Sequence, residues 1–232
     1  MDAPARSSKR SLPFLPQKDP DATKSRILSA AFCQLSTVGY AALSMREIAK
    51  DAEVNHALIN YHFRSKDQLV IAVLDEANRQ LLERQQRMYL GPNTFAEKWA
   101  QARRFYQDDL ASGFVRVQAE LWAASFSDPT LREKFLPRLR DWHNLVLGGV
   151  REALKALEAS GTKLPAPFSA EIITTWISNF WLGMEFLDLI ATSRETAEHT
   201  AALNAVEKLL KQLDSNAKSA SGKRRARRKA GK

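Results

Sequence analysis

The chain has 232 residues, of which 44% are hydrophobic and 26% are charged, and its formal net charge is +9. This composition is typical of a globular protein and excludes a chain that is mainly disordered. The basic charge favours an anionic partner, although eight of the lysines and arginines, and no acidic residue, lie within 215–232. The longest uncharged apolar run, 172–184, is too short to cross a bilayer, so we expect no membrane segment.

The single cysteine and the first residues indicate the compartment. Cys33 can form no intrachain disulfide and falls in an apolar helical pattern, where a small buried thiol is expected. Residues 1–20 contain four prolines among charged residues, unlike a signal peptide, and are predicted to be a flexible arm. We therefore expect a cytoplasmic protein.

Hydrophobic spacing and capping residues predict helices from residue 21 onward. Asp21 can cap the first helix and Gly39 ends it. Its apolar residues recur at helical spacing and are Ile27, Ala30, Ala31, Leu35 and Val38. Ser44 begins a second helix, with Glu47 as the reciprocal residue of a capping box, and this helix runs to about Ala52.

A third short helix follows after about three residues, and the pair predicts a helix-turn-helix. Asn55 can cap this helix. Leu58, Ile59 and Phe63 are expected to supply its buried face.

The rest of the chain favours longer helices. Ser65 with Gln68 starts a helix over 66–89 that links the two parts of the protein. Pro137 would interrupt the hydrogen bonding of segment 129–159, which could therefore form two helices. Further helix starts are marked by Thr94, Asp128 and Ser169. No alternating strand pattern competes, so the predicted fold is all-α with about nine helices.

The stretch 42–69 resembles the DNA-binding region of the TetR family of regulators. The resemblance rests on a capping residue, an Ile-Ala pair, a turn, a short helix with an aromatic end and a lysine that opens the linking helix. These are Ser44, Met45, Glu47, Ile48, Ala49, Tyr61, His62, Phe63 and Lys66. The resemblance covers roughly residues 22–80. Glu53 departs from the glycine usual in this turn, which costs about 1 kcal/mol if its φ is positive.

Pattern and resemblance together divide the chain into parts. Residues 21–81 are predicted to form a three-helix DNA-binding domain and 82–214 a ligand-binding and dimerisation domain. The basic segment 215–232 is expected to be a disordered tail. The resemblance implies a homodimer formed through 169–213 and a repressor that a small-molecule effector releases from a palindromic operator.

The predicted DNA contacts are of two kinds. Residues at the exposed start of the third helix can meet base edges in the major groove, and they are Asn55, His56, Ala57 and Asn60. Others match the family's phosphate-contacting positions or lie at a helix N-terminus, and they are Ser44, Tyr61, His62 and Lys66. Taken alone, either histidine is also explained as an ordinary surface residue, and Ser44 as a simple cap.

Aromatic residues are dense in the C-terminal part and are interleaved with polar side chains. As a set they resemble the wall of a small-molecule cavity, although each of them is also explained by core packing. The predicted ligand-binding residues are Trp99, Tyr106, Trp122, Trp142, His143, Trp181 and Glu185. Tryptophan faces attract organic cations, whose charge Glu120 or Glu185 could balance, and an ordinary apolar metabolite is the alternative.

Two other interpretations remain open from the sequence. One is a general architectural DNA-binding protein that uses the basic tail, and the other is an all-helical enzyme with a fortuitous motif. The sequence contains no recognisable catalytic motif, no glycine-rich phosphate loop and no Cys/His ligand cluster. We therefore expect no enzyme, no cofactor and no bound metal.

Overall fold

The structure, a computed structural model, describes residues 22–159, 161 and 163–230, with side chains up to residue 215. Within these ranges it contains nine α-helices and no strand, which confirms the predicted all-α fold. None of these helices has the length and apolar character needed to cross a membrane. The predicted arm and the helix cap Asp21 lie outside the described residues.

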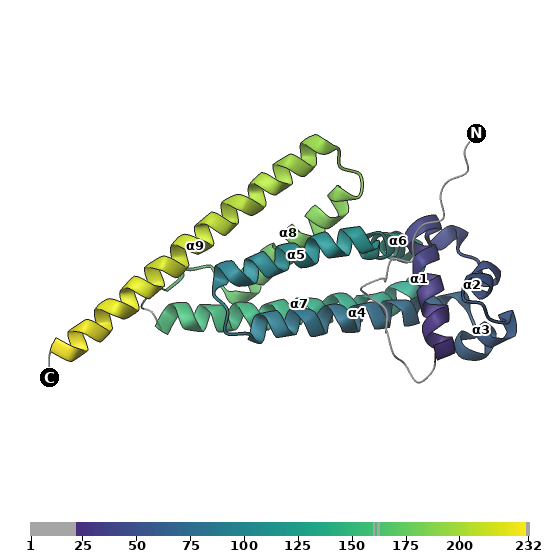
Figure 1. Ribbon diagram of the computed structural model, residues 1–232, viewed down its shortest axis with the longest axis horizontal. Coiled ribbons are helices and arrows are strands. Elements are labelled where there is room, and N and C mark those ends of the chain that lie inside the picture. The colour runs from purple at the N-terminus through teal and green to yellow at the C-terminus, as the bar shows by residue number, and fades with distance from the viewer. Residues whose placement is uncertain (1–21, 160, 162, 231–232) are drawn as a thin grey trace.

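The helices are arranged as a small N-terminal group and a longer bundle. The first group is α1 (Ala22–Ala42), α2 (Met45–Asp51) and α3 (His56–Phe63). The bundle contains α4 (Lys66–Leu90), α5 (Phe95–Ser112), α6 (Phe114–Ser127), α7 (Pro129–Ala159), α8 (Ala170–Asp188) and α9 (Ser193–Ala230). Figure 1 shows α1, α2 and α3 at one end, α4 running alongside α7, and α9 lying obliquely across the other end.

Side-chain caps set the start of most helices. Ser44, Asn55 and Ser65 each accept a hydrogen bond from a backbone N–H two or three residues later, at 2.8 to 3.4 Å. The caps predicted further along the chain are also present, and they are Thr94, Asp128 and Ser169. The capping box predicted at Ser44 is only half formed, because the Glu47 carboxylate lies 3.5 Å from the Lys50 ammonium group.

The first helix follows its predicted pattern with two corrections. Gly39 has a φ of 81° and interrupts the regular helix, as expected. Cys33, predicted to be buried, is exposed, because it lies about 160° around the helix from the fully buried Leu35. Val38, predicted to lie on the core face, is 53% exposed in the last turn before the glycine.

One hydrophobic core joins the N-terminal helices to the bundle. Phe32 and Leu35 of α1 are fully buried and belong to the same cluster of side chains as Phe114 and Leu121 of α6. Helix α1 also packs against α4. The core therefore crosses the domain boundary expected near residue 81.

Helix α7 is continuous where the sequence favoured a break. It includes Pro137 and spans the whole segment 129–159. Proline removes one intrahelical hydrogen bond, but Phe135 before it and Val146 after it are both buried. Packing on both sides of the proline thus holds one helix together.

Helix α9 extends further than the sequence indicated. Disorder was predicted from residue 215, whereas α9 continues to Ala230. Alanine, lysine and arginine have high helix propensity and no proline follows residue 193, so the helix continues through Gly222 despite the low propensity of glycine.

We expect the replacement of Leu35 by alanine to lower the free energy of unfolding by about 2 to 5 kcal/mol, because it leaves a cavity in the shared core. The matched control is Leu58→Ala, since Leu58 is 40% exposed and its loss should cost at most about 1 kcal/mol. Urea unfolding followed by circular dichroism measures both. Equal losses for the two variants would contradict the core described here.

Candidate nucleic-acid interface and internal cavity

Helix α3 buries one face and exposes a polar one. Ile59 and Phe63 are buried in the core, whereas His56 and Asn60 are exposed. The last two residues are one turn apart, and the Asn60 Nδ2 and His56 Nδ1 atoms lie 3.4 Å from each other. An anchored helix with an exposed polar row has the shape and chemistry that can enter a DNA major groove.

The first turn of α3 differs from prediction at one residue. Leu58 was expected to be buried but is 40% exposed, because it lies about 100° around the helix from Ile59. Ala57 beside it is exposed as well. Asn55 is exposed, and its Oδ1 atom accepts the Ala57 N–H at 2.8 Å, which leaves its amide nitrogen and the second lone pair of Oδ1 for another partner.

A second group of side chains lies around the start of α4. Tyr61 is 79% exposed and meets the ring of His62 edge-on, with centroids 5.3 Å apart. The Lys66 ammonium lies 4.5 Å from the centroid of the Tyr40 ring. The Tyr40 hydroxyl donates to Asp67 at 2.7 Å, and burial together with this carboxylate raises the pKa of Tyr40 to about 12. Tyr40 thus stays neutral and holds Lys66 in place by a cation–π contact.

Sequence reasoning missed some residues of this surface. Tyr40 lies outside the motif, so no local pattern connects it with Lys66. Three exposed cations also lie on α2 or directly after α3, and they are Arg46, Lys50 and Arg64. Ser44, the predicted anion-binding cap, is half-buried at the start of α2.

Two residues with side chains take a positive φ on either side of α3. Glu53 has a φ of 54° and Arg64 a φ of 56°. Left-handed backbone costs a non-glycine residue roughly 1 to 2 kcal/mol. The cost anticipated for Glu53, where the family usually has glycine, is therefore present.

Helices α4 to α8 enclose a cavity of about 70 Å³. Four of the predicted ligand-binding residues line it, and they are Tyr106, Trp142, Trp181 and Glu185. The other lining residues are Leu74, Asn78, Leu81, Gln85, Met88, Tyr89, Ala102, Phe105, Asp109, Phe114, Gln118, Phe135, Arg138, Leu139 and Leu182.

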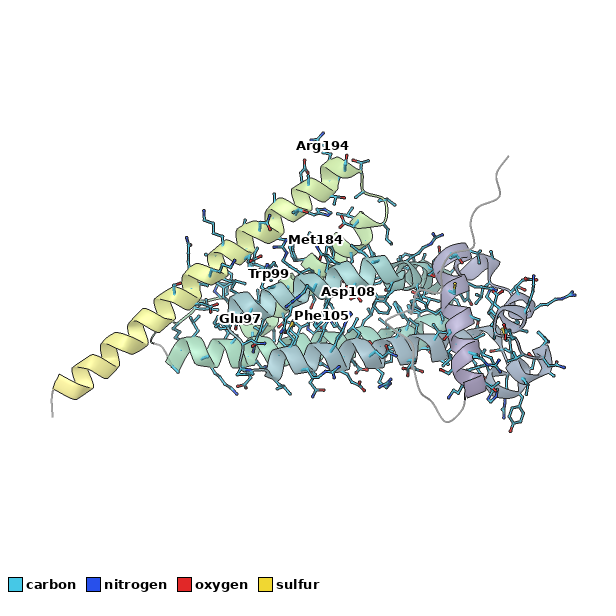
Figure 2. All side chains as sticks on the ribbon, in the orientation of Figure 1. Glu97, Trp99, Phe105, Asp108, Met184 and Arg194 are labelled. Atoms are coloured by element: carbon cyan, nitrogen blue, oxygen red, sulfur yellow. The ribbon has the colours of Figure 1, made fainter. Side chains whose placement is uncertain are left out.

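Trp99, a predicted ligand-binding residue, does not line this cavity. Its ring lies 5.1 Å from the ring of Trp181, and its indole N–H donates to the Leu203 carbonyl at 3.1 Å. Figure 2 shows Trp99 and Met184 inside the bundle, whereas Arg194 lies at the start of α9. Trp99, on α5, therefore packs against α8 and forms a hydrogen bond with α9.

Trp122 and His143 also lie away from the cavity. The ring of Trp122 is 5.4 Å from the ring of Phe186 and perpendicular to it. His143 lies beside α8, with its Nδ1 atom 3.4 Å from the Ser178 hydroxyl. Both residues line a shallow groove between α7 and α8.

Glu120, considered as a counter-charge for a ligand, has a structural role. Its carboxylate accepts the Tyr40 N–H at 3.0 Å and lies against Gly39. A Cβ on this glycine would come within 2.5 Å of a Glu120 oxygen. The contact connects α6 to the break in α1, where the φ of 81° favours glycine.

The cavity also contains buried polar groups that sequence reasoning did not select. Asp109 is 3% exposed and forms an ion pair with Arg84. Burial raises the pKa of Asp109 to about 7 and that of Glu185 to about 8. Asp109 could have been selected from the sequence, because it lies three residues after Tyr106 and therefore on the same buried side of an amphipathic helix.

No group of three or more potential metal ligands is present among the residues whose structure is described. The fold and the exposed face of α3 define an all-helical protein with an N-terminal helix-turn-helix.

Comparison with known sequences agrees with this class. Residues 27–73 match the family described as bacterial regulatory proteins, tetR family. An HTH-type transcriptional repressor of Mycobacterium tuberculosis is 49% identical over 55 residues, which are 24% of this chain and 29% of that protein. A regulator of Mycobacterium bovis matches equally. The chain thus matches less than a third of these relatives' length.

Solved structures resemble the chain over most of its length. The regulator FadR of Bacillus subtilis, solved with stearoyl-CoA, has a TM-score of 0.65 and 22% identity, covering 80% of this chain and 96% of that one. A transcriptional regulator of Saccharomonospora viridis, solved with choline, has a TM-score of 0.60 and 19% identity, covering 82% and 93%. Residues 27–73 are thus similar in sequence to the DNA-binding region of the TetR family, and the described residues share the fold of these solved regulators.

We expect Glu53→Gly to raise the free energy of unfolding by about 1 kcal/mol, because glycine adopts the positive φ without steric cost. Glu47→Gly, inside the regular helix α2, is the control and should lower it by about 1 kcal/mol. Thermal or urea unfolding checks both. A destabilised Glu53→Gly protein would mean that the side chain makes a contact worth more than the strain.

Proposed function

We propose that the protein is a dimeric transcriptional repressor of the cytoplasm that binds a palindromic operator and is released by a small-molecule effector. The observation that carries the proposal is the polar row of His56 and Asn60 on a helix whose opposite face is buried. Such a helix can present side chains to base edges while its core contacts keep its orientation fixed.

The DNA-contacting residues divide by chemistry. Asn60 can bond an adenine edge in a bidentate manner, and His56 beside it can reach a neighbouring base. Asn55 and Ala57 complete the start of this face. Tyr61, His62, Lys66 and the N-terminus of α2 at Ser44 would hold phosphates, which position the helix without reading sequence.

Homodimer formation through 169–213 is supported by apolar side chains that the single chain leaves in solvent. Trp176 and Leu187 of α8 are 60% and 53% exposed, and Leu209 and Leu213 of α9 are 55% and 43% exposed. A patch of this kind typically marks an interface. A two-fold dimer would place two α3 helices about 34 Å apart, one helical turn of DNA.

Release by an effector is supported by the path of α4. This helix begins at Lys66 and lines the cavity with Leu74, Leu81 and Gln85. The cavity measures about 70 Å³, and an effector that enlarges it would move the helices around it. A difference in affinity of about 1 to 3 kcal/mol between two arrangements would couple the sites. Two relatives by fold were solved with ligands, which supports this role.

Footprinting on the DNA upstream of the gene tests the proposal. We expect a palindromic protected site that effector binding abolishes. Diffuse coverage without a fixed site would favour an architectural DNA-binding protein, and no protection at all would favour a protein that does not act on DNA.

We expect Lys66→Ala to weaken binding to every DNA and to reduce the slope of log affinity against log salt by about 1, because one phosphate contact is lost. Asn60→Ala should instead reduce the preference for operator by about 1 to 3 kcal/mol and leave the slope unchanged. Lys155→Ala, an exposed lysine on α7, is the control. Titrations at several salt concentrations separate these effects, and a Lys66→Ala protein with altered preference but an unchanged slope would contradict the assignment.

We expect Trp176→Asp to shift the protein from dimer to monomer, because it places a charge in the apolar face proposed to form the interface. Phe126→Asp is the matched control, since Phe126 is 74% exposed but lies on α6, outside 169–213. Sedimentation at several protein concentrations measures the effect. A Trp176→Asp protein that remained dimeric would place the interface elsewhere.

A further inference from the structure

The cavity between α4 and α8 contains buried hydrogen-bond acceptors that the described residues leave unsatisfied. The Asp109 Oδ1 and Gln118 Oε1 atoms are buried without a partner, and both residues line the cavity. An unsatisfied buried polar group costs about 1 to 3 kcal/mol. A ligand that donates hydrogen bonds at this point would recover that cost.

One carboxyl group at the cavity also has no ion-pair partner among the described side chains. Arg84 forms an ion pair with Asp109, and Arg138 forms one with Asp75, so each of these guanidinium groups already faces a carboxylate. Among the described side chains, Glu185 takes part in no ion pair, although it lines the same cavity. The Glu185 carboxyl group is therefore available to form an ion pair with a single cationic ligand.

The remaining wall suits an apolar ligand body. Phe105, Trp142 and Leu139 line the cavity with rings and aliphatic groups. Trp181 and Met88 line both this cavity and an apolar groove beside α9. An extended chain could thus pass from the acidic end of the cavity into the groove.

We propose that the cavity binds a protonated primary or secondary amine with an apolar body, whose N–H groups donate to Asp109, Gln118 and Glu185. The statement that this amine is the effector rests on the proposed function, whereas its binding in the cavity does not. A quaternary ammonium ion has the charge but no N–H group, so it could not satisfy the unpaired acceptors.

Binding should depend on pH because it displaces protons. Three groups on the surrounding helices interact electrostatically with Glu185, and they are Arg84 of α4 and Tyr106 and Asp109 of α5, while Arg138 of α7 lines the same cavity. Burial raises the pKa values of Asp109 and Glu185 to about 7 and about 8, so the empty cavity retains protons at neutral pH. An ammonium group favours the ionised carboxylates. Its affinity should therefore rise as the pH increases from about 7 to about 9 and fall as the carboxyls become protonated.

The test uses the full-length protein and four probes of equal chain length: hexylamine, hexyltrimethylammonium, hexanol and hexanoate. Calorimetry measures affinity, and the fluorescence of Trp142 and Trp181 reports occupancy of the cavity. We expect hexylamine to bind about tenfold or more tightly than each of the others, the advantage of a charge-assisted hydrogen bond. Its affinity should increase between pH 7 and pH 9, whereas that of hexanol should stay constant.

Three variants assign the contacts. Glu185→Gln should weaken hexylamine binding by about tenfold or more and abolish its pH dependence near 8, while hexanol binding is unchanged. Gln118→Leu removes an acceptor but no charge and should also weaken hexylamine binding. Glu171→Gln, an exposed carboxylate on the same helix, is the control and should have no effect.

The proposal is overturned if hexanoate or hexanol binds as tightly as hexylamine, if no saturable hexylamine binding occurs, or if Glu185→Gln binds hexylamine as the unchanged protein does. Footprinting with the same probe separates this inference from the proposed function. Hexylamine that occupies the cavity and leaves the DNA protected supports the cavity assignment and contradicts effector-controlled release.

Discussion

The packing of α1 against α6 is the constraint on which the rest of the structure depends. Phe32 and Leu35 share one core with Phe114 and Leu121, so the helix-turn-helix has no separate hydrophobic centre. At the end of α1, the Glu120 carboxylate accepts the Tyr40 N–H beside the break at Gly39. These contacts determine where α2 and α3 lie relative to the bundle.

The same contacts connect the candidate interface with the cavity. Tyr40 receives the Glu120 hydrogen bond on its backbone and holds Lys66 by its ring. Lys66 begins α4, and this helix continues to cavity residues such as Gln85. Movement of α4 or α6 around the cavity would therefore displace Lys66, the lysine proposed to contact phosphate, without any flexible segment between them.

Local chemistry made much of the fold predictable. The caps Ser44, Asn55 and Ser65 act within three residues of their own position, so the sequence alone indicates where α2, α3 and α4 begin. The exposed row of His56 and Asn60 follows from helical spacing alone. The break expected at Pro137 was not predictable in this way, because contacts of α7 with distant helices outweigh the one missing hydrogen bond and the helix stays continuous.

The cavity was less predictable because it depends on which side chains meet across helices. The cavity is lined by Tyr106, Trp142, Trp181 and Glu185. Trp99 is aromatic as well, but its indole N–H forms a hydrogen bond with α9 instead. Composition cannot separate these roles, since all are aromatic or acidic residues on amphipathic helices. The exposure of Cys33 shows the same limit: an apolar pattern marks a helix but leaves its rotation uncertain by part of a turn.

The shared core also constrains how the protein can be recombined with its relatives. The strong sequence match ends near residue 73, yet the surface that α1 requires is supplied by α6, some forty residues later. A DNA-binding domain transplanted from a relative at that boundary would pack its first helix against an α6 surface to which its own side chains are not matched. If the proposed function holds, a change of operator preference is therefore best made by substitutions on the exposed face of α3 alone, which leave the packing of α1 against α6 intact.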